Sequence, residues 1–124
     1  MKESKFSDVF RHYMRAHPMK SAAFELKQTK TNSISFSKLE DHQADALVAA
    51  KTRGILHKIG DETTRQKPFD MVYLRKAEAY VVIKYPDGFY FIDIHRFLKE
   101  KEESYRKSLT SQRAKEIALY CFVY

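Results

Sequence analysis

Apolar side chains recur every three to four residues near the start of the chain, which is the spacing of one face of an α-helix. These positions are Phe6, Val9, Phe10, Tyr13 and Met14. The pattern stops before Pro18, which cannot continue a helix, so we predict that the helix ends there.

Residues 22–28 alternate between apolar and polar side chains, which is the pattern of a β-strand. Phe24 and Leu26 would face one side of this strand. Glu25 and Lys27 would face the other side, about 6–7 Å apart along the backbone. An acid and a cation this close could together reach one metal-bound water and one phosphate. A plain ion pair on an exposed strand face would have the same sequence, so both interpretations stay open.

A second helix is predicted after residues 29–35, which are mostly polar and are expected to form a loop. Ser37 and Glu40 have the spacing of a capping box, which places the helix start there. The helix would run to about Arg53, and its inward stripe contains one polar residue, Gln43. The stripe consists of Leu39, Gln43, Ala46, Leu47 and Ala50. Since a buried amide needs hydrogen-bond partners, Gln43 is either satisfied within the core or aimed at the polar face of the preceding strand.

The rest of the chain is predicted to contain four strands and then two helices. The strands are residues 55–59, 69–74, 79–85 and 89–94, and the helices are residues 95–107 and 111–119. The tight-turn sequence Tyr85-Pro86-Asp87-Gly88 makes the last two strands a hairpin. Residues 60–67 are a polar loop. This order predicts one α/β domain over residues 1–124, a sandwich with a mixed sheet.

Composition is that of a globular domain, and the charge indicates a polyanionic partner. Of 124 residues, 23 are Lys or Arg and 16 are Asp or Glu, which gives a net charge of +7. Such a surplus attracts nucleic acid, although it could equally serve solubility. The single cysteine, Cys121, excludes an internal disulfide and a cysteine-based zinc site. No apolar run has the roughly 20 residues of a membrane span, and none follows the N-terminus, so we expect a cytoplasmic, intracellular protein.

Three segments together resemble the PD-(D/E)XK nuclease superfamily, and within it the Holliday-junction resolvases of archaea, phages and Gram-positive bacteria. They are Phe-Glu-Leu-Lys-Gln-Thr-Lys at 24–30, Ile-Ser-Phe-Ser at 34–37, and His42-Gln43 followed by Leu47. The resemblance implies a restriction-endonuclease-like αβα sandwich with a central mixed sheet. It also implies a structure-selective endonuclease that hydrolyses four-way or other branched DNA with Mg²⁺, or with Mn²⁺ in its place. The same likeness would fit a phage- or prophage-encoded protein.

By this resemblance Glu25 and Lys27 are catalytic, and Gln43 supports them. A second acid would join Glu25 in holding the metal. The family supplies that acid on the strand before Glu-x-Lys, but residues 10–23 contain none. We therefore predict that Asp70, at the start of a hydrophobic strand, is the second metal ligand and a catalytic residue.

Other acids are weaker candidates for the metal site. Asp93, near a strand end, is the reserve for Asp70. Resolvases also tend to carry an acid on their first helix, and Glu3 or Asp8 would fill that place. Pro86-Asp87 spells the family's Pro-Asp motif but lies in the predicted turn, so we reject it.

Four cations, Arg11, Arg15, Lys30 and Lys38, are predicted to steer DNA, since phosphate contacts supply most of the affinity that does not depend on sequence. A four-way junction has near two-fold symmetry, so paired cuts predict a homodimer, for which the apolar residues 119–124 are a candidate interface. Two alternatives stay open. One is a non-catalytic nucleic-acid-binding module that keeps the nuclease fold, and the other is a nuclease for flap or duplex DNA.

Overall fold

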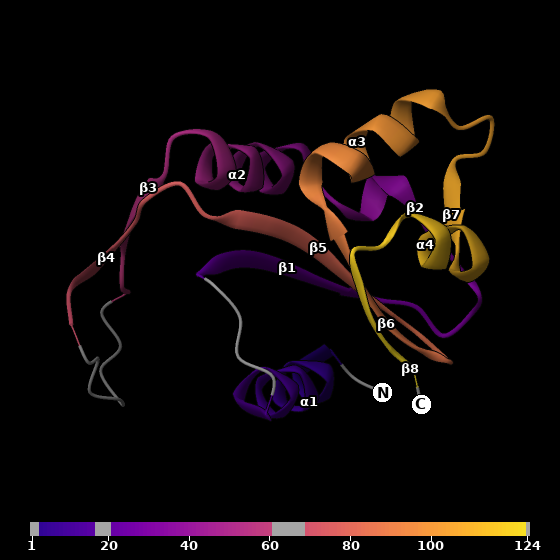
Figure 1. The fold of residues 1–124 in the computed structure, drawn as a ribbon, viewed down its shortest axis with the longest axis horizontal. Helices are drawn as coiled ribbons and strands as arrows, with labels where there is room; N and C mark the ends of the chain where they lie inside the picture. The colour runs from indigo at the N-terminus through magenta and orange to yellow at the C-terminus, as the bar shows by residue number, and fades with distance from the viewer. Residues whose placement is uncertain (1–2, 17–20, 61–68, 124) are drawn as a thin grey trace.

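The computed structural model describes residues 3–16, 21–60 and 69–123 (Figure 1). These ranges contain both helices and strands. The helices are α1 (Glu3–Ala16), the short 3-10 helix η1 (Phe36–Lys38), α2 (Asp41–Thr52), α3 (Ile94–Glu103) and α4 (Ser111–Ile117). The strands are β1 (Ala22–Gln28), β2 (Ser33–Ser35), β3 (Ile55–Lys58), β4 (Met71–Leu74), β5 (Glu78–Tyr85), β6 (Gly88–Asp93), β7 (Ser108–Thr110) and β8 (Tyr120–Val123).

Four strands form a central mixed sheet in the order β1-β5-β6-β8. β1 runs parallel to β5, whereas β6 is antiparallel to both β5 and β8. Within the described residues β1 is therefore an edge strand of this sheet. Two small antiparallel ribbons accompany the sheet, one formed by β2 and β7 and the other by β3 and β4.

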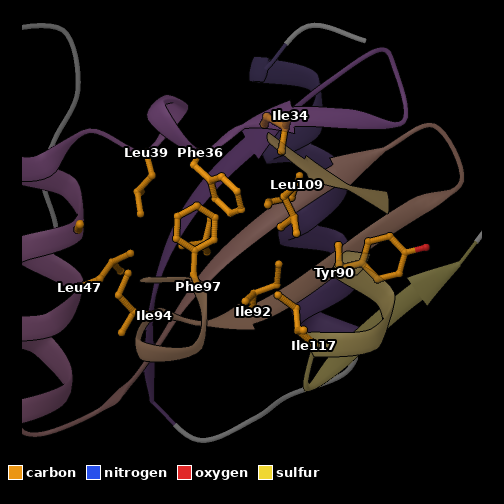
Figure 2. Packing of buried hydrophobic residues seen from close by; sticks show 14 of the residues in the cluster. Ile34, Phe36, Leu39, Leu47, Tyr90, Ile92, Ile94, Phe97, Leu109 and Ile117 are labelled. Carbon is orange, nitrogen blue, oxygen red and sulfur yellow. The ribbon is translucent and has the colours of Figure 1, made fainter. Parts of the chain in front are cut away.

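Helices cover both faces of the central sheet, as predicted (Figure 1). On one face, Phe6 and Phe10 of α1 pack against the phenylalanines of β6, with Phe6 and Phe89 ring centroids 5.8 Å apart. On the other face, α2, α3 and α4 enclose a larger apolar cluster, part of which Figure 2 shows. β5 and β6 are buried on both sides because they supply residues to both clusters. The mixed α/β sandwich is confirmed, and the restriction-endonuclease-like subtype remains a proposal.

The second helix begins later than the sequence predicted. Ser37 lies in η1, where its backbone N–H donates to Ser35 Oγ at 3.3 Å. The residue before α2 is Glu40, whose backbone N–H donates to Gln43 Oε1 at 3.0 Å. The capping box is therefore Glu-x-x-Gln, three residues further along the chain. Leu47 and Ala50 of the predicted inward stripe are buried, whereas Ala46 is exposed and Ala44 is buried instead.

Three short strands were not predicted, and two predicted helices end early. β2 lies in the predicted loop, and β8 forms most of the apolar chain end. α3 ends at Glu103 rather than at residue 107, because the following residues lead into the β2–β7 ribbon. Here the backbone N–H of Phe36 donates to the Lys107 carbonyl at 3.0 Å. These pairings join residues far apart in the sequence, so no local sequence pattern predicts them.

The predicted β5–β6 hairpin is confirmed, with Tyr85 opposite Gly88. Gly88 has a φ of +156° and lies against the backbone of β8. A Cβ at this position would lie 2.2 Å from the Phe122 carbonyl oxygen. Glycine is therefore required here for β8 to pair with β6.

None of the helices in the described part of the chain combines the length and the apolar character needed to cross a lipid bilayer.

Candidate functional site

Glu25 and Lys27 lie in the middle of β1 and face the same side of the sheet, as the alternation predicted. Their neighbours Phe24 and Leu26 pack in the cluster on the α1 side. The Lys27 Nζ is 3.4 Å from the Glu25 Oε1, and the two side chains are 18% and 30% exposed. The ion pair is therefore partly desolvated but can still be reached by a solvent-borne ligand.

Gln43 joins this pair from the first turn of α2. Its Nε2 donates to Glu25 Oε1 at 3.0 Å, and its Oε1 accepts the backbone N–H of Glu40 at 3.0 Å. One end of the amide is thus fixed by the helix terminus while the other end holds the carboxylate. The expectation that Gln43 is aimed at the strand is confirmed, and the amide is not an isolated core group.

Asp70 does not join these three residues. It lies in a bend before β4, and β4 pairs only with β3 among the described residues. Figure 1 shows that the ribbon of β3 and β4 extends away from β1. The prediction took residues 69–74 for a buried strand of the central sheet, but Met71 and Tyr73 are 52% and 63% exposed. The expectation that Asp70 lies on a strand of the central sheet next to β1 is therefore wrong.

Asp93, the reserve candidate, has a structural role. Its Oδ2 accepts the backbone N–H groups of His95 at 3.0 Å and Arg96 at 3.3 Å, which caps α3. Its other carboxylate oxygen pairs with Lys51 of α2. Both oxygens are thus used to join α2 and α3 to the end of β6.

The candidates on the first helix lie across the sheet from Glu25. Asp8 is exposed on α1 and pairs with Arg11 at 3.6 Å, and Arg15 is exposed in the last turn. The Glu3 side chain falls outside the described atoms. Because α1 covers the opposite face, Arg11 and Arg15 lie across the sheet from Lys27, and their part in steering DNA stays a prediction.

The other two predicted DNA-steering cations lie on segments next to Glu25 and Lys27. Lys30 follows β1 and lines a cavity of about 190 Å³ together with Thr29 and Lys84. Lys38 is exposed at the end of η1, just before α2. Lys84 was missed by the sequence reasoning because it belongs to β5, and only the parallel pairing of β5 with β1 brings it beside Gln28.

Among the residues that the structure describes, Glu25 is the one carboxylate that the site offers to a metal ion. Glu40 approaches Gln43 through its backbone, but its own carboxylate contacts His42 Nδ1 at 3.3 Å and is largely exposed. Over residues 3–16, 21–60 and 69–123 there is no group of three or more His, Cys, Asp or Glu arranged for a metal ion. Since Mg²⁺ is commonly held by one or two carboxylates with water and substrate phosphate, Glu25 meets the minimum for an ion shared with bound DNA.

No protein-family model matches this chain, and no curated protein sequence matches it. The likeness to the PD-(D/E)XK nucleases therefore rests on the residues of β1, η1 and α2 and on the contacts that join them.

Proposed function

We propose that this chain is a metal-dependent DNA endonuclease of the resolvase type, which hydrolyses phosphodiester bonds in branched DNA. The observation that supports the proposal is the contact between Glu25, Lys27 and Gln43. These residues come from two elements separated in sequence, and the hydrogen bond from Gln43 to Glu25 joins the elements at the acid. The Glu-x-Lys spacing of Glu25 and Lys27 alone would not require a residue of a second element to contact the acid.

Each of the three side chains has a distinct task in this proposal. Lys27 stabilises the negative charge that gathers on the phosphoryl oxygens during the reaction. Gln43 orients the Glu25 carboxylate, and Glu25 would hold Mg²⁺ or Mn²⁺. When bound, such an ion lowers the pKa of an attacking water and polarises the phosphate. Lys30 and Lys38, which lie on segments next to Glu25 and Lys27, would hold the DNA backbone.

A homodimer is part of the same proposal, because a junction needs two cuts related by two-fold symmetry. Leu119, Tyr120 and Val123 are 60%, 49% and 50% exposed on or next to β8. β8 is also the sheet edge opposite β1 within the described residues, so its outer backbone groups can pair with a second copy. We propose that the second copy binds at this edge.

The test is cleavage of a labelled four-way junction in Mg²⁺, in Mn²⁺ and in a chelator. Glu25→Gln should abolish cleavage and leave junction binding nearly unchanged, and Lys27→Ala should lower the cleavage rate by about 10²–10³. Asp70→Asn is the matched control, since Asp70 lies away from β1, and it should cleave like the wild type. Wild-type cleavage by Glu25→Gln would refute the proposal. Loss of cleavage in Asp70→Asn would mean that Asp70 belongs to the site and that its use as a control is wrong.

A non-catalytic nucleic-acid-binding module is the second candidate. It is favoured by the single carboxylate that the described residues bring to the site, whereas two acids hold the metal in the resembled family. Junction binding without cleavage in either metal would establish it. Comparing the cleavage of junction, flap and linear duplex DNA would decide whether the enzyme acts on junctions or on the other two forms.

A further inference from the structure

A cleft of about 430 Å³ lies between η1 and the segment that connects α3 to β7. Its two walls are held together by backbone contacts. The backbone N–H of Phe36 donates to the Lys107 carbonyl at 3.0 Å. The adjoining residues, Ser35 and Ser108, are paired in the β2–β7 ribbon. The Phe36 ring is 3% exposed and packs edge-on against Phe97, with ring centroids 5.6 Å apart. The base of the cleft is therefore part of the core, and its shape does not depend on a ligand.

Among the described residues, three cations and no acid line this cleft. Lys101, Arg106 and Lys107 are all exposed, and none forms an ion pair within the part of the chain that the structure describes. The nearby carboxylate of Glu100 is already engaged, since the Arg113 Nε and Nη2 donate to it at 2.8 Å and 3.1 Å. The positive charge in the cleft is thus available to an anion.

Hydroxyl groups add donors beside these cations. Ser35 Oγ and Ser37 Oγ lie 2.8 Å apart, so one hydroxyl hydrogen joins them and the other is left for a ligand. Ser104 lines the opposite wall and accepts the backbone N–H of Arg106 at 3.1 Å, which shapes the turn that carries the cations. Cations with hydroxyl donors are a typical surrounding for a phosphate group.

Tyr105 follows Ser104 and precedes Arg106 in the cleft wall, and the residue is fully exposed, at 106%. An aromatic ring left in water next to a cationic cleft offers a stacking surface for an unpaired base. The cleft and the Glu25 site also lie on the same side of the sheet, because Phe36 and Leu47 of α2 belong to one apolar cluster. One strand of nucleic acid could therefore run from one site toward the other.

We infer that this cleft binds single-stranded nucleic acid. Lys101, Arg106 and Lys107 contact its phosphates, and Tyr105 stacks on a base. The inference concerns binding alone and does not depend on hydrolysis at Glu25. It gives the protein a contact for an unpaired strand next to a junction or flap.

The experiment measures the fluorescence anisotropy of a labelled oligothymidylate with the full-length protein in a chelator, where no cleavage is expected. Tyr105→Ala should weaken binding about tenfold, and Tyr105→Phe should restore it, because stacking needs the ring and not the hydroxyl. Arg106→Ala should reduce the slope of log K against log salt by about 0.7, the value of one lost phosphate contact on a single strand. Lys99→Ala, an exposed cation on α3 outside the cleft, is the matched control and should change neither quantity.

Several results would overturn the inference. One is equal binding by Tyr105→Ala and the wild type, and another is a loss in Lys99→Ala as large as that in Arg106→Ala. A third is displacement of the oligonucleotide by inorganic phosphate at a concentration equal to that of the oligonucleotide's own phosphate groups, which would show that the cleft is a simple anion site. Since these side chains are exposed, the variants should fold, which far-UV circular dichroism checks. Glu25→Gln should bind the oligonucleotide like the wild type, so failure here is distinct from failure of the proposed hydrolysis.

Discussion

Gln43→Ala is the substitution that most directly tests how the site is held together. It removes two hydrogen bonds of 3.0 Å, one donated to Glu25 and one accepted from the Glu40 backbone. The loss of a helix N-terminal cap contact costs about 1 kcal/mol. A hydrogen bond to a charged group contributes about 1.5–3 kcal/mol, but water can replace part of it because the Glu25 side chain is 30% exposed. We expect a total loss of about 2 kcal/mol in the free energy of unfolding.

Urea denaturation followed by far-UV circular dichroism measures this loss, with junction cleavage measured in parallel. Asp45→Ala, an exposed change on the same helix, is the control and should stay within about 0.5 kcal/mol of the wild type. The cleavage rate should fall further in Gln43→Ala than in Asp45→Ala, because Glu25 is no longer oriented. Equal stability of the two variants would refute the view that Gln43 holds the acid in place.

Gln43→Glu tests the same contact by placing a second carboxyl group beside Glu25. The new carboxyl group would face Glu25, and repulsion between two carboxylates raises the pKa of one of them in the folded state. A raised folded-state pKa stabilises the protein at low pH, and that stability is lost as the pH rises through it. The variant should therefore be closer to the wild type in urea midpoint at acidic pH than at neutral pH. If the variant and the wild type differ in urea midpoint by the same amount at acidic and at neutral pH, the contact between residue 43 and Glu25 is contradicted.

Three further predictions concern other parts of the molecule. Tyr85→Phe removes a buried hydrogen bond of 2.9 Å to the Leu109 carbonyl and should cost about 1–3 kcal/mol in the free energy of unfolding by urea. Hydrogen bonds from Arg113 hold the pKa of Glu100 below its ordinary value, so this contribution is present at neutral pH and lost as the pH falls through the lowered pKa. Glu100→Gln should thus be destabilised at neutral pH, and the gap in urea midpoint should close in acid. Gel filtration with light scattering should show a dimer that Val123→Lys weakens, and a monomeric wild type at micromolar concentration would exclude the proposed interface.

Much of the candidate site could be predicted from the sequence because its parts follow local periodicity. The alternation of residues 22–28 places Glu25 and Lys27 on one face whatever the strand pairs with. The helical stripe that contains Gln43 likewise required a polar partner, and the preceding strand supplied one. The β5–β6 hairpin followed from its turn sequence, since Gly88 allows a backbone conformation that other residues avoid.

What the tertiary structure alone decided is which distant segments meet. Residues 71–74 are as apolar as a core strand, yet they pair with β3 and leave Asp70 away from Glu25. Lys84 reaches the end of β1 only through a parallel pairing between residues 56 positions apart in the sequence, Gln28 and Lys84. Likewise, the cleft beside Tyr105 exists only because β2 and β7 come together. Hydrophobic periodicity records which side of an element is buried, but not which element buries it, and the site depends on both.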